Sequence, residues 1–214
     1  MDHAEFTCAA HNRLRLTASE VGCVRGGREV FSRLNFDLSA AEALLVRGPN
    51  GVGKSSLLRL IAGLLRPVAG RLELAGGHPE LTIAEQSHYL GHQDAVTSAL
   101  SVSENLAFWA RYLGAGRTDG RDALHTVGLA ALSNLPAMYL SAGQRRRLAI
   151  ARLIAVKRPI WLLDEPTSAL DATARTRLTE LMRAHLLAGG LIIAATHGPL
   201  DLDAFKELWL GGAV

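Results

Sequence analysis

Residues 48–55 read GPNGVGKS and match the phosphate-loop pattern G-x-x-x-x-G-K-[S/T] in full. A short apolar run, Ala43 to Val46, precedes them, and apolar residues recur at helical spacing from Lys54 to Leu65. A phosphate loop needs this strand–turn–helix setting. The residues expected to bind a nucleotide are Gly48, Pro49, Asn50, Gly51, Val52, Gly53, Lys54, Ser55 and Ser56.

The residue types in this loop suit phosphate chemistry. Glycines allow backbone conformations in which successive N–H groups point at phosphate oxygens, and the helix N-terminus adds a positive dipole end. Lys54 would place an ammonium on the β- and γ-phosphates of ATP, and Ser55 would offer a hydroxyl to Mg²⁺. The structural alternative is a chance glycine turn followed by a surface lysine.

Two carboxylates follow a second apolar run. Ile160 to Leu163 predicts a strand buried on both faces, and Asp164 and Glu165 come at its carboxyl end, where such sheets bind ligands. We expect Asp164 to orient Mg²⁺ and Glu165 to polarise the attacking water as general base. Alternatively, the two carboxylates simply end a strand in a solvated turn.

The rest of the chain completes an α/β pattern. Leu191 to Ala195 predicts another buried strand, and a helix at about 171–188, with Asp171 as N-cap, precedes it. Residues 14–46 are β-rich around a turn at Arg25–Arg28, and the region from about Val96 to Arg158 is mostly helical, with capping boxes expected at Ser101 and Glu104 and at Ser141 and Gln144. We expect a single domain, residues 1–214, with a P-loop NTPase core, a mostly parallel sheet, an N-terminal antiparallel β region and a helical subdomain inserted at about 95–158.

Composition narrows the class of protein. The chain has 214 residues, 49% of them apolar and 20% charged, with a net charge of +3. These values indicate a globular chain, and the small charge does not require a nucleic-acid partner. No apolar run has the roughly 18–20 residues of a membrane span, and the N-terminus lacks the order of a secretion signal. We expect a cytoplasmic protein with two reduced cysteines, Cys8 and Cys23, that acts on membranes through a partner.

Four further motifs resemble those of the ABC ATPases. Leu140 to Gln144, LSAGQ, resembles the signature sequence, and Ser168 to Asp171 resembles the D-loop. His197 stands where that family has its switch histidine, and Gln93 stands where it has its Q-loop glutamine. With the phosphate loop, the motifs keep the order of the family, and the resemblance covers the chain from about residue 14 to 200.

This resemblance implies a mechanism. Two subunits, here a homodimer, would pair head to tail, and each ATP would lie between the phosphate loop of one subunit and the signature of the other. Ser141, Gly143 and Gln144 would face the ATP of the partner, and Asp171 would lie beside it. Gln93 and His197 would assist Glu165 in catalysis, and Gln93 would also contact Mg²⁺. ATP hydrolysis would drive integral membrane transporter subunits.

The adenine contact departs from the family pattern. ABC domains usually stack the base on an aromatic residue about 23 residues before the first glycine of the loop, and that position is Arg25 here. A guanidinium can stack on a base. Alternatively, Arg25 is a plain charge on a hairpin.

Finer resemblance points to the ATP-binding subunits of bacterial heme exporters, which serve cytochrome c maturation. It is carried by residues 45–51 (LVRGPNG), 90–93 (LGHQ), 140–147 (LSAGQRRR), 159–165 (PIWLLDE) and 195–200 (ATHGPL). The resemblance implies heme export from the cytoplasmic face of the inner membrane, where the subunit would be peripheral. The alternatives are another exported cargo, an ABC ATPase acting on DNA or ribosomes, and a non-catalytic nucleotide-gated scaffold. The presence of Glu165 and His197 argues against the scaffold.

Three groups of residues each allow two interpretations. No residue indicates a direct heme site: His88 and His92 form either a ligand pair or, as we expect, part of a polar loop. Arg145 to Arg147 form either a contact to lipid or a partner or, as we expect, a solvated helix face. The apolar residues between 95 and 100 form either a docking groove for membrane subunits or a loop packed on its own domain.

Overall fold

The computed structural model of this chain describes residues 14–114, 120–198 and 200–211. They divide into two compact units. The first, here the α/β unit, comprises Met1–Gly91, Arg158–Pro166 and Met182–Val214. The second, here the helical unit, comprises His92–Lys157 and Thr167–Leu181. Cys8 lies outside the described residues, and Cys23 is buried and free.

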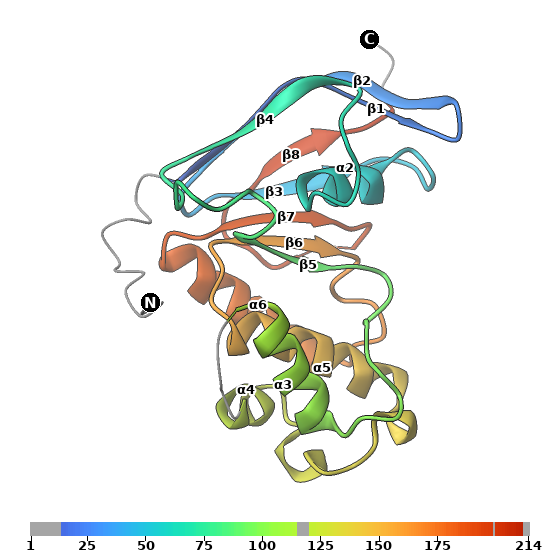
Figure 1. The fold of residues 1–214 in the computed structure, drawn as a ribbon, viewed down its shortest axis with the longest axis vertical. Coiled ribbons are helices and arrows are strands. Elements are labelled where there is room, and N and C mark those ends of the chain that lie inside the picture. Colours follow the sequence, from blue (N-terminus) through green and yellow to red (C-terminus); the bar gives the residue numbers. More distant parts are fainter. Residues whose placement is uncertain (1–13, 115–119, 199, 212–214) are drawn as a thin grey trace. The chain divides into compact units, whose positions relative to one another are not determined.

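A five-stranded parallel sheet forms the centre of the α/β unit (Figure 1). Its strand order is β5-β6-β7-β3-β8, and every neighbouring pair is parallel. The two runs expected to be buried strands are buried at every residue, because parallel sheets are covered on both faces. The strands are β3 (Ala43–Arg47), β5 (Ser87–Leu90), β6 (Ile160–Asp164), β7 (Leu191–Ala195) and β8 (Lys206–Trp209).

A three-stranded antiparallel sheet, in the order β2-β1-β4, completes this unit. Its strands are β1 (Arg15–Arg25), β2 (Arg28–Ser39) and β4 (Ala69–Ala75). Helix α2 (Lys54–Ile61) lies between the two sheets (Figure 1). One core joins all three layers through Leu16, Leu57 and Leu162, which are fully buried. The α/β fold class and the antiparallel N-terminal region are therefore confirmed.

Helix α2 is shorter than predicted. It ends at Ile61 rather than Leu65, because Gly63 takes a left-handed conformation with φ of 72°. The amide of Gly63 donates to Leu60 O at 3.1 Å, and that of Leu64 donates to Arg59 O at 2.8 Å. A glycine just past the last turn is a common helix stop, and here it outweighs the apolar spacing.

The helical unit is built on α3 and α5, which pack against each other and bury Leu106, Ala110 and Leu148. Both predicted capping boxes are confirmed, at Ser101 and Glu104 for α3 and at Ser141 and Gln144 for α5. Among the described residues, no helix is both long and apolar enough to cross a membrane. The helices are α3 (Val102–Tyr112), α4 (Arg121–Thr126), α5 (Ala142–Ala155) and α6 (Ala172–Leu187), of which α6 belongs to this unit only as far as Leu181, with 3-10 turns η1 (Ala130–Leu132) and η2 (Ala137–Tyr139).

Candidate functional site

The phosphate loop connects β3 to α2, as expected. Its glycines have positive φ angles, 134° at Gly48, 79° at Gly51 and 115° at Gly53, which L residues rarely adopt. Space is also limiting, since a Cβ at Gly48 would collide with the carbonyl oxygen of Leu210. The loop therefore depends on glycine for both its conformation and its close packing, and α2 begins directly after Gly53 with its N–H groups facing the loop.

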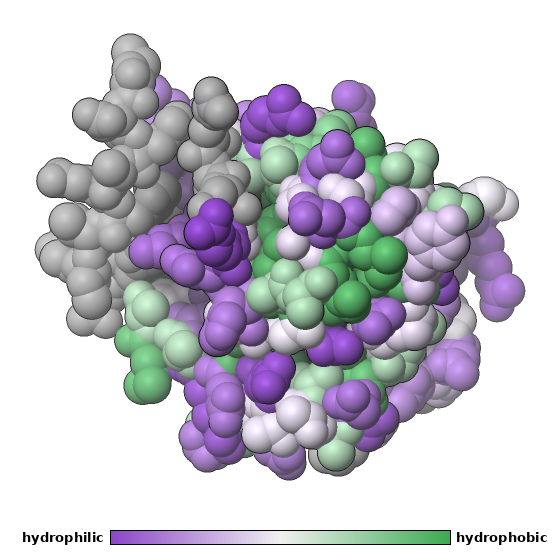
Figure 2. Space-filling model, turned by 90° about the horizontal axis from the view of Figure 1, so that it is seen from below, coloured by the Kyte–Doolittle hydropathy of each residue, from purple (hydrophilic) through white to green (hydrophobic). Residues whose placement is uncertain are grey.

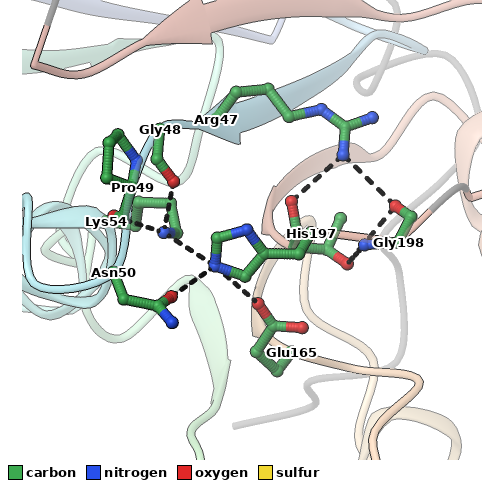
Figure 3. A network of polar contacts seen from close by, with 9 residues as sticks. Arg47, Gly48, Pro49, Asn50, Lys54, Glu165, His197 and Gly198 are labelled. Atoms are coloured by element: carbon green, nitrogen blue, oxygen red, sulfur yellow. Dashed lines mark hydrogen bonds and ion pairs between the residues drawn. The ribbon is translucent and has the colours of Figure 1, made fainter.

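Lys54 lies across the loop. Its ammonium donates to the carbonyl oxygens of Gly48 at 2.7 Å and Pro49 at 2.9 Å, and it lies 3.1 Å from His197 Nε2 (Figure 3). Because Lys54 is buried, its ammonium is held in one position and does not move freely in solvent. Anionic oxygens are stronger partners for an ammonium than carbonyls are, and a phosphate arriving at the loop finds the positive charge already placed.

His197 brings the loop and the carboxylate edge of the sheet together. It follows β7, and its Nε2 lies 2.6 Å from Asn50 Oδ1 and 4.0 Å from Glu165 Oε1 (Figure 3). The nitrogen can donate to Asn50 or accept from Lys54, according to its tautomer. One imidazole thus contacts the phosphate loop from the side on which Glu165 lies.

Glu165 follows β6 and holds an uncommon backbone conformation. Its φ is 47°, and its amide donates to Ala195 O of β7 at 2.8 Å. A non-glycine residue with positive φ is uncommon and is often found where function requires it. The side chain is about one-third exposed, so water can reach the carboxylate. Such a carboxylate can act as a base toward a water molecule between it and the loop.

Asp164 and Ser55 supply the oxygen donors expected for a metal ion. Asp164 is buried at the carboxyl end of β6, and Ser55 lies in the first turn of α2. Burial raises the pKa of the Tyr89 hydroxyl, the hydrogen bond from Arg59 opposes this, and the charge of Asp164 raises the pKa further. The charge of the Asp164 carboxylate therefore acts on Tyr89 inside the α/β unit. Hard oxygen donors of this kind suit Mg²⁺.

A metal cage made only of protein is not found in the described part of the chain. No group of three or more His, Cys, Asp or Glu side chains there could hold a metal ion. Mg²⁺ is usually bound through one or two protein oxygens together with substrate phosphates, and it seldom has an all-protein cage. One hydroxyl and one carboxylate beside a phosphate loop fit that mode.

The remaining site residues lie in the helical unit. Ser141 Oγ accepts from the amide of Gln144 at 3.2 Å, and Gln144 Oε1 accepts from the amide of Ser141 at 2.8 Å. A Cβ at Gly143 would lie 2.8 Å from Ala169 O, so the signature glycine packs against the D-loop segment. Asp171 Oδ1 accepts from the amide of Ala174 at 2.8 Å, as expected of an N-cap. Gln93 is exposed shortly after β5.

Comparison with known proteins places the chain. The family described as "ABC transporter" matches residues 31–168. The chain belongs to the ABC transporter family. It is 58% identical over 200 residues to the "Cytochrome c biogenesis ATP-binding export protein CcmA" of Nitrobacter winogradskyi, covering 94% of this chain and 100% of that protein. It is also 58% identical over 199 residues to the protein of that name from Bradyrhizobium diazoefficiens, covering 93% and 99%.

Solved structures agree on the fold. "Structure of ATP binding subunit of ABC transporter" is 21% identical with a TM-score of 0.81, covering 91% of this chain and 85% of that one. "Structure of a bacterial Atm1-family ABC exporter with ATP bound" is 27% identical with a TM-score of 0.78, covering 93% of this chain and 37% of that one. The chain is therefore the nucleotide-binding, ATP-hydrolysing subunit of an ABC transporter, a class that works as a dimer with a membrane partner.

The position expected to contact the adenine base is Arg25. It is exposed at the end of β1, and no described contact joins it to residues 48–56. Its charge is felt by Cys23, since burial raises the pKa of that thiol and Arg25 lowers it.

Arg47 is a site residue that the sequence did not single out. Its guanidinium donates to Thr196 O at 3.1 Å and Gly198 O at 3.2 Å, so it holds both neighbours of His197 (Figure 3). It also lies 3.3 Å from Glu207 of β8. An arginine before a phosphate loop gives no sign of carbonyls about 150 residues further on, so only the fold could reveal it.

Two expectations about basic side chains are wrong. His88 is buried in β5, opposite Trp161 of β6, rather than in a polar loop, whereas His92 is exposed in the loop beside Gln93 as expected. The arginines of α5 do not form a solvated face: Arg146 is buried, while Arg145 donates to Leu140 O and Arg147 donates to Val127 O. The chain makes these contacts by bringing distant carbonyls and carboxylates to the helix, which spacing along one helix cannot predict.

Proposed function

We propose that two copies of this chain bind and hydrolyse ATP between them and so drive heme export for c-type cytochrome biogenesis, through integral membrane subunits on the cytoplasmic face of the inner membrane. The observation that carries the cargo is the 58% identity, over nearly the whole length, to proteins named for cytochrome c biogenesis export. Residues 1–214 would form one ABC ATP-binding domain with a helical subdomain at about 95–158.

Binding of ATP would begin at the phosphate loop. Its phosphates would accept from the N–H groups of the loop and of the start of α2, and from Lys54, which already points across the loop. Ser55, Asp164 and Gln93 would hold Mg²⁺, and the ion would neutralise charge on the phosphates. Because Lys54 acts on phosphates in both ground and transition states, its main effect would be on binding.

Hydrolysis would be carried by Glu165 and His197. The Glu165 carboxylate would accept a proton from a water molecule. The oxygen of that water would attack the γ-phosphorus while the bond between the γ-phosphorus and the ADP oxygen breaks. His197 would donate from Nε2 to a γ-phosphate oxygen. Asn50 at 2.6 Å supports this, because it lies on the same nitrogen and can hold the ring in place. Arg47 would fix the backbone on both sides of the ring.

The signature would complete the site from the second subunit. Ser141 and Ala142 are exposed, and the first N–H groups of α5 have no partner within the helix. A γ-phosphate is a suitable acceptor for them, with Ser141 and Gly143 nearest and Gln144 and Asp171 beside them. After hydrolysis the γ-phosphate leaves, the link between the subunits weakens, and the dimer opens.

Contact with membrane subunits would use the loop after Gln93 and helix α3. Ala95 and Ala99 are exposed, Val96 and Leu100 are half-buried, and α3 exposes Phe108 and Tyr112. Seen from below, the molecule has hydrophobic side chains in the middle of the face with hydrophilic ones around them (Figure 2). The mixture of exposed and half-buried residues leaves the loop able to pack on its own unit and still present an apolar surface.

Two variants separate docking from ATP binding. Ala99→Glu and Tyr112→Glu put charge on exposed positions of this surface and should release the subunit from membranes without changing ATP affinity. Leu187→Glu is the matched control, since Leu187 is 88% exposed on α6, away from the loop in sequence. Equal release by Leu187→Glu, or retention of the first two, would contradict this docking surface.

Cargo is tested in cells. Loss of the gene should remove mature c-type cytochromes, and a copy carrying Glu165→Gln should fail to restore them, because export needs turnover. Heme staining of membrane proteins measures the effect. Normal c-type cytochromes in the deletion strain, with no second copy of the gene, would overturn heme export and leave the ATPase standing.

A further inference from the structure

The segment that follows Gln93, residues 94–100, is tied to the signature helix by a partly buried ion pair. Asp94 Oδ1 lies 3.1 Å from Arg146 Nη1, and Arg146 is 4% exposed while Asp94 is 22% exposed. Arg146 lies five residues after Ser141 on α5, which is about one and a half helical turns. Because a helix is rigid over that distance, any displacement of Ser141 is carried to Arg146.

A second link joins the same helix to the same segment. Arg152 of α5 is buried, with its Cζ 4.5 Å from the centre of the Trp109 ring, and Trp109 Nε1 donates to Ala95 O at 2.9 Å. Burial lowers the pKa of Arg152 to about 10, and the Asp94 carboxylate opposes that shift. Asp94 therefore compensates part of the cost of burying two arginines of one helix, which makes it more than a surface partner.

The far end of the segment is tied to the turn before the signature. The amide of Met138 donates to Ser98 O at 3.0 Å, and the amide of Ala137 donates to Leu100 O at 2.9 Å. Both donors lie in η2, which ends just before Ser141. Within the helical unit, contacts from α5 and η2 hold residues 94–100 at both ends.

We propose that Asp94 and Arg146 are positioning residues, whose ion pair fixes the segment after Gln93 to the signature helix. Binding of the partner's γ-phosphate at Ser141 then sets the position of Gln93 in the same subunit, so that occupancy of one ATP site is reported to the other. This inference rests on the proposed function, because it needs the signature to face an ATP of the second subunit.

Hydrogen exchange in a chain that binds ATP without turning it over tests this link. In Glu165→Gln, ATP should slow amide exchange in the first turn of α5 and also in residues 94–100, by about fivefold or more in each. In Glu165→Gln carrying Asp94→Asn and Arg146→Gln, which removes the charge of both partners of the pair, α5 should still be protected by ATP. Residues 94–100 should then lose that protection.

The three variants Asp94→Asn, Arg146→Gln and their combination should lose the protection of residues 94–100 to the same extent, because one interaction is removed in each. Additive losses would overturn the proposal. The matched control is Arg183→Gln with Asp203→Asn, an ion pair of 3.5 Å in the α/β unit, which should leave the protection unchanged. Asp94→Glu guards against loss of folding: it keeps the charge that pairs with Arg146 and should restore at least part of the protection, whereas protection as low as in Asp94→Asn would contradict the proposal.

Dimer formation, measured by sedimentation, and ATP affinity, measured by titration, distinguish failure of the proposed function from failure of this inference. If Glu165→Gln does not dimerise with ATP, the proposed function fails and this inference fails with it. If it dimerises and the double variant keeps the protection of residues 94–100, only the inference fails. A double variant that binds ATP normally and cannot dimerise would also overturn it, because the pair would then serve assembly of the signature rather than its link to Gln93.

Discussion

The phosphate-loop region and the signature region differ in what a single chain supplies to each. In the α/β unit, Lys54, Asn50, Glu165 and His197 come from three separate segments and meet around one imidazole nitrogen. In the helical unit, Ser141 caps its own helix through the capping box with Gln144. The described contacts bring none of the four side chains named above to it. The first region is an assembled group of polar side chains, which we propose as the catalytic site, and the second is a helix N-terminus for which we propose a ligand from the second subunit.

This difference explains why the fold can keep the two regions in different units. Catalysis depends on distances of a few tenths of an ångström, which strands of one sheet can hold. The N-terminus of α5 needs only to meet the nucleotide of the partner with its own backbone already ordered. The capping box and the close approach of Gly143 to Ala169 O stabilise that backbone. Changes in the first region should therefore alter chemistry, and changes in the second should alter assembly.

The largest effect is expected at the base. Glu165→Gln removes the proton acceptor and keeps the size of the side chain, so turnover should fall by about 10²-fold or more while ATP binding stays intact. The variant should accumulate as an ATP-bound dimer. Phosphate release and sedimentation measure the two properties. Near-normal turnover would show that the base lies elsewhere and would remove the first half of the comparison.

A smaller effect is expected at Arg47, which acts through the backbone around His197. Arg47→Gln removes hydrogen bonds from a charged donor to Thr196 O and Gly198 O, so kcat should fall by about tenfold, or about 1.4 kcal/mol, with little change in KM. The matched control is Arg15→Gln, which breaks an exposed pair with Asp37 at 3.3 Å and should leave kcat unchanged. An unchanged kcat in Arg47→Gln would mean that the loop after β7 positions His197 unaided.

How far the sequence predicts this molecule depends on the range of the interaction. The phosphate loop, the two buried strands and both capping boxes are set by neighbours within a few residues, and they were predicted from the sequence. Strand β8, which reads KELW, was not predicted, because its exposed polar residues give no alternating pattern. The burial of Arg146 depends on Asp94, 52 residues away, and no local pattern contains that information.

The smallest effect is expected at the base of the nucleotide. With Arg25 exposed and no aromatic residue at that position, ATP and GTP should be hydrolysed with kcat/KM values within about tenfold of each other. Arg25→Tyr should tighten nucleotide binding if stacking limits affinity, since an aromatic ring offers the larger face. Titration with both nucleotides decides this. An unchanged affinity in Arg25→Ala would identify Arg25 as a surface charge only.

Complementation between two inactive chains tests the central claim most directly. Lys54→Ala disables the phosphate loop and Ser141→Arg disables the signature, so each homodimer lacks every complete site. Random pairing gives a mixed dimer half of the time, with one complete site in each, so an equimolar mixture should recover about a quarter of the wild-type ATPase rate. The account predicts this recovery, together with a wild-type rate that rises more steeply than linearly with protein concentration. A mixture no more active than its two components would contradict a site shared between subunits.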